Sequence, residues 1–319
     1  MCGIVGIFDL KGRSIDNDLL ASMNRALSHR GVDDEGYLFI NQKKQTFMNR
    51  SGPDSPAAVQ NLYPKISRAG SEFVANIGLG HRRFSIIDLT PRGHQPFFDS
   101  MQRCCVIFNG EIYNYIELRE ELEDKGHTFH SESDTETIVE AYKAWGMNCF
   151  EKMNGMWALA LYDFQRKILI ISRDRLGKIP LYWTKLENTI YFASEIKALL
   201  MIKEAAKRKS VNEEAIWAYL NWGYPGQPHK TFFDGIMSFP AACWAVLDGN
   251  FPENIRPYWR LPSERWGEQD ISILEATRAI KELLRDAVRI RLRADVPWCL
   301  ELSGGMDSSV LLALASELS

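Results

Sequence analysis

The chain opens with MCGIVGIF, Met1 to Phe8, an apolar stretch with a cysteine directly behind the first methionine. β-Branched residues around Gly3 and Gly6 predict a buried first strand. This constrains the fold strongly, because the start of the chain is then part of the core. The stretch has two interpretations: an incidental cysteine in a buried strand, or an active site at the start of the chain.

The second interpretation has a chemical basis. A thiolate attacks a carboxamide carbonyl, but a free thiol has a pKa of ~8.5 and needs a neighbouring base. Removal of Met1 would give Cys2 a free α-amine with a pKa of ~7.7–8.0, which could take the thiol proton and return it to departing ammonia. Gly3 and Gly6 would let the backbone pass close to a substrate.

Bulk properties exclude several classes of protein. The 319 residues suggest about two domains, and a net charge of -3 provides no basic field for nucleic acid. No apolar run reaches the ~20 residues that span a bilayer, and no basic region precedes the first apolar stretch, so we expect a cytoplasmic protein. Six cysteines without a C-x-x-C spacing and six scattered histidines predict neither a disulfide scaffold nor a metal site.

Short apolar runs dominate residues 1–200. Strands are predicted at 105–109, 167–172 and 189–194, with a helix at 17–27. A capping box from Ser133 to Glu136 predicts a second helix that ends at Gly146.

The rest of the chain has a different pattern. Prolines punctuate residues 201–270, which we interpret as a connector. A capping box from Ser272 to Glu275 starts a long amphipathic helix, followed by a strand at 298–302, a loop at 303–308 and a helix at 309–318. One strand and two helices cannot close a doubly wound sheet, so this second domain is expected to be incomplete.

Three further features of the first 200 residues suggest chemistry. Asn109 and Gly110 follow an apolar strand and could form an oxyanion hole, although Asn-Gly is also the commonest hairpin turn. Arg82 or Arg83 could clamp a carboxylate, or could be a solvated charge on an edge strand. Asp134 begins a helix, where capping of the helix dipole alone would explain it.

Taken together, these segments closely resemble the glutaminase domain of class II glutamine amidotransferases, and most closely the glutamine-hydrolysing asparagine synthetase family. The resemblance covers nearly all of residues 1–200 and rests on motifs that occur in the family's order: MCGIVGIF, HRGVDDEG, GHRRFSIIDL, GHQPF, NGEIYNY, SDTE, RDRLG and ASEIKALL.

The resemblance implies an α+β fold, the α-β-β-α sandwich of N-terminal nucleophile (Ntn) hydrolases. It also implies site residues: Cys2 as the nucleophile with its α-amine as base, Asn109 and Gly110 as the oxyanion hole, Arg83 on the α-carboxylate of glutamine, Glu111 and Asp134 on its α-ammonium, and the backbone of Ile86 and Ile87 as pocket wall.

A second motif, LSGGMDSSV, lies between a predicted strand and a predicted helix, where glycines and a helix N-terminus favour phosphate. Read alone, Ser-Gly-Gly could be a turn or a linker. In this context it resembles the pyrophosphate loop of ATP pyrophosphatases, a Rossmann-like α/β domain. The resemblance implies that ATP with Mg2+ activates aspartate as an adenylate, which ammonia then amidates, and that the ATP-binding residues are Leu302, Ser303, Gly304, Gly305, Asp307 and Ser308.

The chain also departs from the family pattern. Val32 replaces a proline, Ile179 is inserted before Pro180, and Glu301 places a carboxylate in the predicted strand, where burial is costly. The family's later acidic motif is missing. We therefore expect a glutaminase domain at 1–200, a connector at 201–270 and an incomplete synthetase domain at 271–319, which alone acts at most as a glutaminase.

Other functions stay open at this point. The acceptor could be another carboxylate, such as a sugar uronate in surface-polysaccharide assembly. The chain could instead be a non-catalytic paralogue that binds glutamine or a partner. The expected ligands are glutamine and aspartate or another carboxylate acceptor, with neither nucleic acid nor membrane, and a homodimer is possible.

Overall fold

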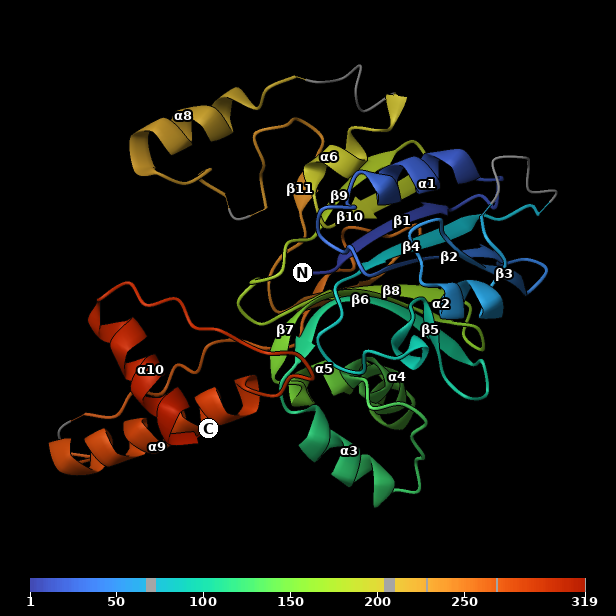
Figure 1. The fold of residues 1–319 in the computed structure, drawn as a ribbon. Coiled ribbons are helices and arrows are strands. Elements are labelled where there is room, and N and C mark those ends of the chain that lie inside the picture. Colours follow the sequence, from blue (N-terminus) through green and yellow to red (C-terminus); the bar gives the residue numbers. More distant parts are fainter. Residues whose placement is uncertain (67–72, 204–209, 228, 268, 319) are drawn as a thin grey trace.

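A computed structural model describes residues 1–66, 73–203, 210–227, 229–267 and 269–318. Two antiparallel sheets are stacked face to face, and helices cover both outer faces (Figure 1). This arrangement confirms the expected α-β-β-α sandwich. Among the described residues, no helix combines the length and the apolar character needed to cross a bilayer.

The first sheet has the opening strand near its middle. Helices α1 (Asn17–Arg25) and α6 (Ile196–Leu199) lie on its outer face (Figure 1). Within the described residues the spatial order of its strands is β11 (Met237–Ser238), β9 (Tyr182–Leu186), β10 (Thr189–Ala193), β1 (Gly3–Asp9), β4 (Ile77–Arg83), β2 (Asp34–Asn41) and β3 (Thr46–Ser51).

The second sheet is covered by three helices on its far side: α3 (Tyr115–Glu123), α4 (Asp134–Trp145) and α5 (Cys149–Lys152). Its strands, in spatial order, are β13 (Arg256–Pro257), β12 (Cys243–Val246), β8 (Ile168–Arg173), β7 (Gly155–Asp163), β6 (Cys104–Ile112) and β5 (Phe97–Phe98). A short helix, α2 (Ala57–Leu62), follows β3.

Strand β1 is buried on both faces because successive side chains alternate between two cores. Ile4 and Phe8 pack between the sheets, whereas Val5 and Ile7 pack with the helices outside the first sheet. A Cβ added to Gly6 would lie 2.0 Å from the Phe192 ring. Gly6 is therefore required by core packing, and the expectation that it admits a substrate is wrong.

Gly3 has a similar role. A Cβ there would lie 3.1 Å from Leu27, which follows the end of α1. The glycine allows α1 to pack closely on the strand. Packing against Leu27 thus explains Gly3, and its approach to a substrate stays a prediction.

Segment 201–270, interpreted above as a connector, contributes to both sheets. Strand β11 pairs with β9 in the first sheet, and β12 pairs with β8 in the second. In the sequence, helix α8 (Glu213–Trp222) precedes these strands. Asn212 caps its start, and Gly223, in a left-handed backbone conformation, caps its end. The segment therefore completes the sandwich as well as linking it to the residues that follow.

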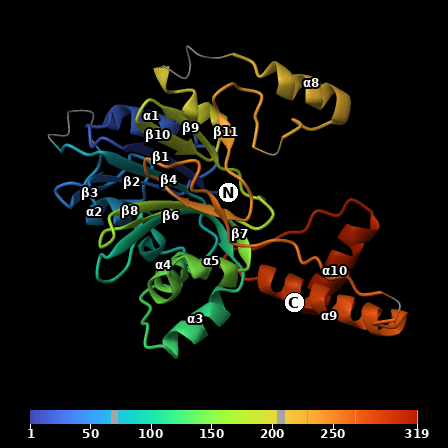
Figure 2. The same cartoon turned by 180° about the vertical axis from the view of Figure 1, so that it is seen from behind.

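The last elements are helices α9 (Ile273–Arg291) and α10 (Met306–Leu318), which form a pair beside the sandwich (Figure 1, Figure 2). The C-terminal end of α9 contacts the sandwich, where Arg289 forms an ion pair with Glu117 of α3 at 3.4 Å. The capping box from Ser272 to Glu275 is confirmed. Residues 298–302 form no strand, which corrects the prediction, because no described strand lies beside them to supply hydrogen bonds.

The capping box predicted at Ser133 is only half formed. Ser133 caps α4 by accepting a hydrogen bond from Thr135 N. The Glu136 carboxylate instead accepts from the backbone N–H groups of His130 and Ser131, which lie before the helix. Glu136 therefore fixes the loop that leads into α4, and Gly146 ends the helix as expected.

Candidate active site

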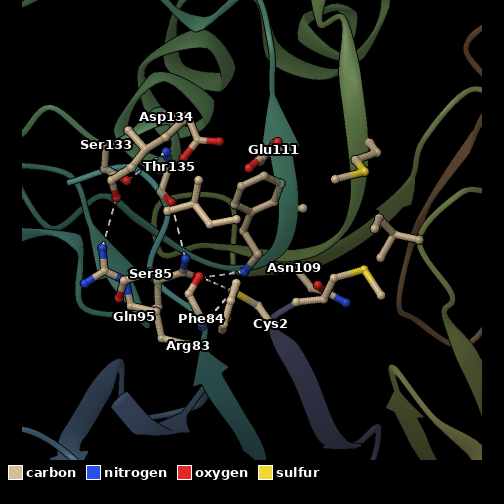
Figure 3. A pocket seen from close by; sticks show the side chains of 17 residues that line it. Cys2, Arg83, Phe84, Ser85, Gln95, Asn109, Glu111, Ser133, Asp134 and Thr135 are labelled. Carbon is tan, nitrogen blue, oxygen red and sulfur yellow. Dashed lines mark hydrogen bonds between the residues drawn. The ribbon is translucent and has the colours of Figure 1, made fainter. Parts of the chain in front are cut away.

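The predicted site residues surround a single hollow where the ends of β1 and β4, from the first sheet, meet β6 of the second (Figure 3). The hollow opens to solvent and holds about 540 Å³ of empty space, part of which is open solvent. Its lining includes the predicted residues Cys2, Arg83, Ile86, Ile87, Asn109, Gly110, Glu111 and Asp134.

Cys2 directly precedes β1, and two hydrogen bonds fix its position. The Phe84 backbone N–H donates to Sγ at 3.3 Å, and Arg30 Nε donates to the Cys2 carbonyl at 2.8 Å. Arg30 is in turn fixed by Glu195 at 3.0 Å. Burial raises the pKa of the Cys2 thiol, although the bond from Phe84 opposes this. At neutral pH the thiol therefore keeps its proton unless a base removes it.

In the described chain Met1 is still attached, so the nitrogen of Cys2 is part of a peptide bond. The α-amine belongs to Met1, which also lines the hollow, and burial lowers the pKa of that amine. The base expected for Cys2 exists only after Met1 is removed.

The neighbouring arginines of β4 have different environments. Arg82 is fully engaged in ion pairs with Glu35 at 2.9 Å and Asp54 at 2.6 Å. Arg83 is also buried, yet no carboxylate among the described residues forms an ion pair with it. Both lie on an inner strand, so neither is the solvated edge-strand charge considered above. Only Arg83 lines the hollow.

Carbonyl oxygens of a short loop hold the Arg83 guanidinium. Its Nη2 donates to Ile87 O at 3.2 Å and to Asp88 O at 2.5 Å, and its Nη1 donates to Thr90 O at 3.2 Å. Neutral carbonyls orient the guanidinium without cancelling its charge. The backbone of Ile86 and Ile87 thus forms a wall of the hollow and also helps to fix Arg83.

Asn109 and Gly110 lie inside β6, paired with Ala158 and Trp157 of β7, and therefore do not form a hairpin turn. A Cβ on Gly110 would lie 1.9 Å from Met156 O, so the close approach of β7 demands glycine there. The Asn109 amide reaches Ser194, with Nδ2 3.2 Å from Oγ.

Two carboxylates line the side of the hollow opposite the arginine in Figure 3. Burial raises the pKa of Asp134 to about 6, even though the Ile112 backbone N–H donates to Oδ2 at 2.9 Å. Burial, with the nearby charge of Asp134, raises the pKa of Glu111 to about 7. A cation placed between these carboxyl groups would stabilise their ionised forms, which burial disfavours. Dipole capping alone therefore does not account for Asp134.

Several residues that complete this arrangement were not singled out from the sequence. Gln95 accepts from Phe108 N at 2.7 Å and donates to Thr135 at 3.3 Å, which joins two walls of the hollow. Arg30 and Ser194 hold the backbone of Cys2 and the amide of Asn109. All three occur inside motifs quoted above, but nothing in their local spacing indicates these contacts.

The second predicted site, residues 302–308, lies outside this hollow on the exposed start of α10. Gly304 has φ +80°, and the loop is closed by a contact of 3.0 Å between the hydroxyls of Ser303 and Ser308. The loop leads directly into α10, whose first N–H groups have no acceptor within the helix. Glu301 and Val32 are both exposed, so Glu301 incurs no burial cost here.

In the part of the chain that the structure describes, no group of three or more histidine, cysteine, aspartate or glutamate side chains is placed to hold a metal ion.

Known families and proteins are similar to this chain. A family model described as a glutamine amidotransferase domain matches residues 67–259, and one described as asparagine synthase matches residues 279–319. A Methanocaldococcus jannaschii protein provisionally named asparagine synthetase [glutamine-hydrolyzing] 2 is 34% identical over 99% of this chain and 57% of its own length. Asparagine synthetase [glutamine-hydrolyzing] 1 of Bacillus subtilis is 31% identical over 99% of this chain and 44% of its own length.

The chain thus spans about half the length of these curated relatives. Among solved structures, glutamine phosphoribosylpyrophosphate amidotransferase from B. subtilis aligns with a TM-score of 0.55 and 15% identity, covering 99% of this chain and 64% of that one. At this identity the likeness concerns the fold alone.

Proposed function

The chain belongs to the family of glutamine amidotransferase domains, with glutamine-hydrolysing asparagine synthetases among its relatives, and from this premise we propose that its hollow hydrolyses glutamine. One observation carries the proposal. Arg83 is a buried cation without a carboxylate partner among the described residues, and it faces two carboxylates with raised pKa values across one small hollow. A free amino acid, with one carboxylate and one ammonium group, has the complementary charges.

Each step of the reaction has a candidate group. The α-amine of trimmed Cys2 takes the thiol proton, and the thiolate attacks the side-chain carboxamide of glutamine. Negative charge develops on the carboxamide oxygen, where the Asn109 amide and the Gly110 N–H stabilise it. The ammonium form of the amine then protonates the departing ammonia. Water hydrolyses the thioester to glutamate and restores the thiol.

The role of Asn109 requires its Nδ2 to point into the hollow. In the structure Nδ2 faces Ser194, and Oδ1 is buried without a hydrogen-bond partner among the described residues. The Ser194 hydroxyl accepts from Ile4 N at 3.0 Å and therefore has a hydrogen to donate. Turning the amide by half a turn lets Ser194 donate to Oδ1 and frees Nδ2 for the oxyanion.

For the full-length protein we propose asparagine synthesis, supported by the named relatives and the match of residues 279–319. Residues 302–308 fit a phosphate group, because Gly304 is left-handed, Gly305 leaves room and α10 begins there. These residues would hold the phosphates of ATP together with Mg2+. ATP would supply the activation of the acceptor carboxylate. Aspartate as acceptor, a homodimer and a cytoplasmic location stay predictions.

Removal of Met1 should decide whether the chain is active. We expect the mass of the purified active chain to lack one methionine residue, and glutamine to be converted to glutamate and ammonia. A chain in which an uncleaved residue precedes Cys2 should lose about 10²-fold or more in kcat, because a peptide nitrogen cannot act as the base. Equal glutaminase rates for the two chains, measured by glutamate release, would refute the mechanism.

Glutamine affinity should depend on pH through the two carboxylates. Below their pKa values of about 6 for Asp134 and about 7 for Glu111 they are protonated and do not attract an ammonium group. We therefore expect KM for glutamine to fall as pH rises through this range. Glu111→Gln should raise KM and remove the inflection near pH 7 while leaving the one that Asp134 causes. A KM that does not change with pH would contradict the assignment of these carboxylates.

A further inference from the structure

The short segment that follows α9 contacts two parts of the sandwich next to the hollow, the end of β6 and the loop that holds Arg83. After α9 the chain runs past the sandwich before it reaches residues 302–308 (Figure 2). On the way, Arg293 Nη1 donates to Tyr113 O at 2.6 Å, directly after the end of β6. Asp295 contacts the loop that holds Arg83. This segment lies beyond residue 259, where the match to the glutamine amidotransferase family ends.

Asp295 brackets the Arg83 loop with two hydrogen bonds. Its backbone N–H donates to Ile86 O at 2.9 Å, and its Oδ2 accepts from Asp88 N at 2.7 Å. Asp88 and the residue before it, Ile87, supply two of the carbonyl oxygens that accept from the Arg83 guanidinium. Asp295 and Arg83 thus both form hydrogen bonds to the backbone of the same short loop.

The loop needs such support because of its conformation. Asp88 has φ +52°, a left-handed backbone conformation that is strained for a residue other than glycine. Its carboxylate is already engaged, accepting from Thr90 N at 3.0 Å and from Glu132 N at 3.0 Å. The remaining polar group of this residue, the N–H, is satisfied by Asp295.

We propose that Asp295 is a positioning residue of the glutamine site, which holds the loop at Ile86–Asp88 so that Arg83 faces the α-carboxylate of glutamine. This inference rests on the proposed glutaminase function. It assigns part of the affinity for glutamine to a residue of the asparagine synthase segment, outside the domain that carries the nucleophile.

The position is convenient to test because Asp295 is exposed, so its replacement leaves the core intact. We expect Asp295→Ala to raise KM for glutamine about three- to tenfold with little change in kcat, as for the loss of one hydrogen bond that orients a charged group. Asp295→Asn keeps an oxygen that accepts from Asp88 and should restore most of the affinity. Alkylation of Cys2 by iodoacetamide, which lacks an α-carboxylate, should proceed at the same rate in all variants.

Asp286→Ala is the matched control, since Asp286 is an exposed aspartate on α9 that pairs with Arg289. It should leave KM unchanged. The unmodified chain is assayed first: absence of Cys2-dependent hydrolysis would refute the proposed function and the role that rests on it. Normal hydrolysis together with an unchanged KM in Asp295→Ala would refute the positioning role alone. If Asp295→Ala lowered kcat and the alkylation rate by the same factor as it raised KM, the contact would be merely structural. That result would also overturn the positioning role.

Discussion

Replacing Cys2 with alanine should reduce glutamine hydrolysis about 10³-fold or more, the loss expected when the nucleophile of a covalent mechanism is removed. No other cysteine lines the hollow, so no second thiol can substitute for it. The measurement is glutamate release at saturating glutamine. Glutamine should still bind, because Arg83, Glu111 and Asp134 are untouched, so calorimetry on the variant should show a Kd close to the KM of the active chain.

Cys299 provides the matched control, since it is exposed and remote from the hollow. Cys299→Ala should hydrolyse glutamine at the unmodified rate. If Cys2→Ala were as active as this control, the nucleophile would lie elsewhere and the proposed mechanism would be wrong.

Asn109→Ala should lower kcat by about 10²- to 10³-fold while KM changes little, because the amide stabilises charge that develops only in the transition state. Asn109 lies at the buried end of an inner strand, so thermal unfolding must be measured alongside the kinetics. An unchanged melting temperature with a reduced kcat would assign the loss to chemistry. A rise in KM with unchanged kcat would contradict the oxyanion role.

Asn41→Ala is a suitable control for this variant. The Asn41 amide likewise donates a hydrogen bond within the protein, to Val74 O at 2.7 Å, but it lies outside the hollow. It should leave kcat unchanged, which separates the loss of a catalytic amide from the loss of an ordinary structural one.

Local patterns in the sequence predicted much of the fold. Runs of β-branched residues correctly indicated β6, β8 and β10, and the Ser272 cap correctly indicated the start of α9. The strand predicted at 298–302 failed because a strand needs a neighbour as well as an apolar sequence. The two-residue pairings of β11 and β13 are too short to leave a periodic signal.

The residues around the hollow were predictable where their chemistry is distinctive. A cysteine at the chain start, an Asn-Gly pair after a strand and paired arginines each suggest a reaction or a ligand by themselves. Local sequence alone does not distinguish Arg82 from Arg83. The family resemblance implies Arg83, and the structure shows the physical difference, since Arg82 forms ion pairs with Glu35 and Asp54. The bond between Asp88 and Asp295 joins residues about two hundred positions apart, and no local pattern encodes it.

The nucleophile belongs to one sheet and the oxyanion amide to the other, so the thickness of the layer between the sheets sets their separation. That layer is filled by side chains of both sheets, such as Phe192 of β10 and Ile107 of β6. The side chains between the sheets therefore set the distance between the Cys2 thiol and the Asn109 amide. Trimming a side chain there should slow turnover at temperatures well below those that melt the protein.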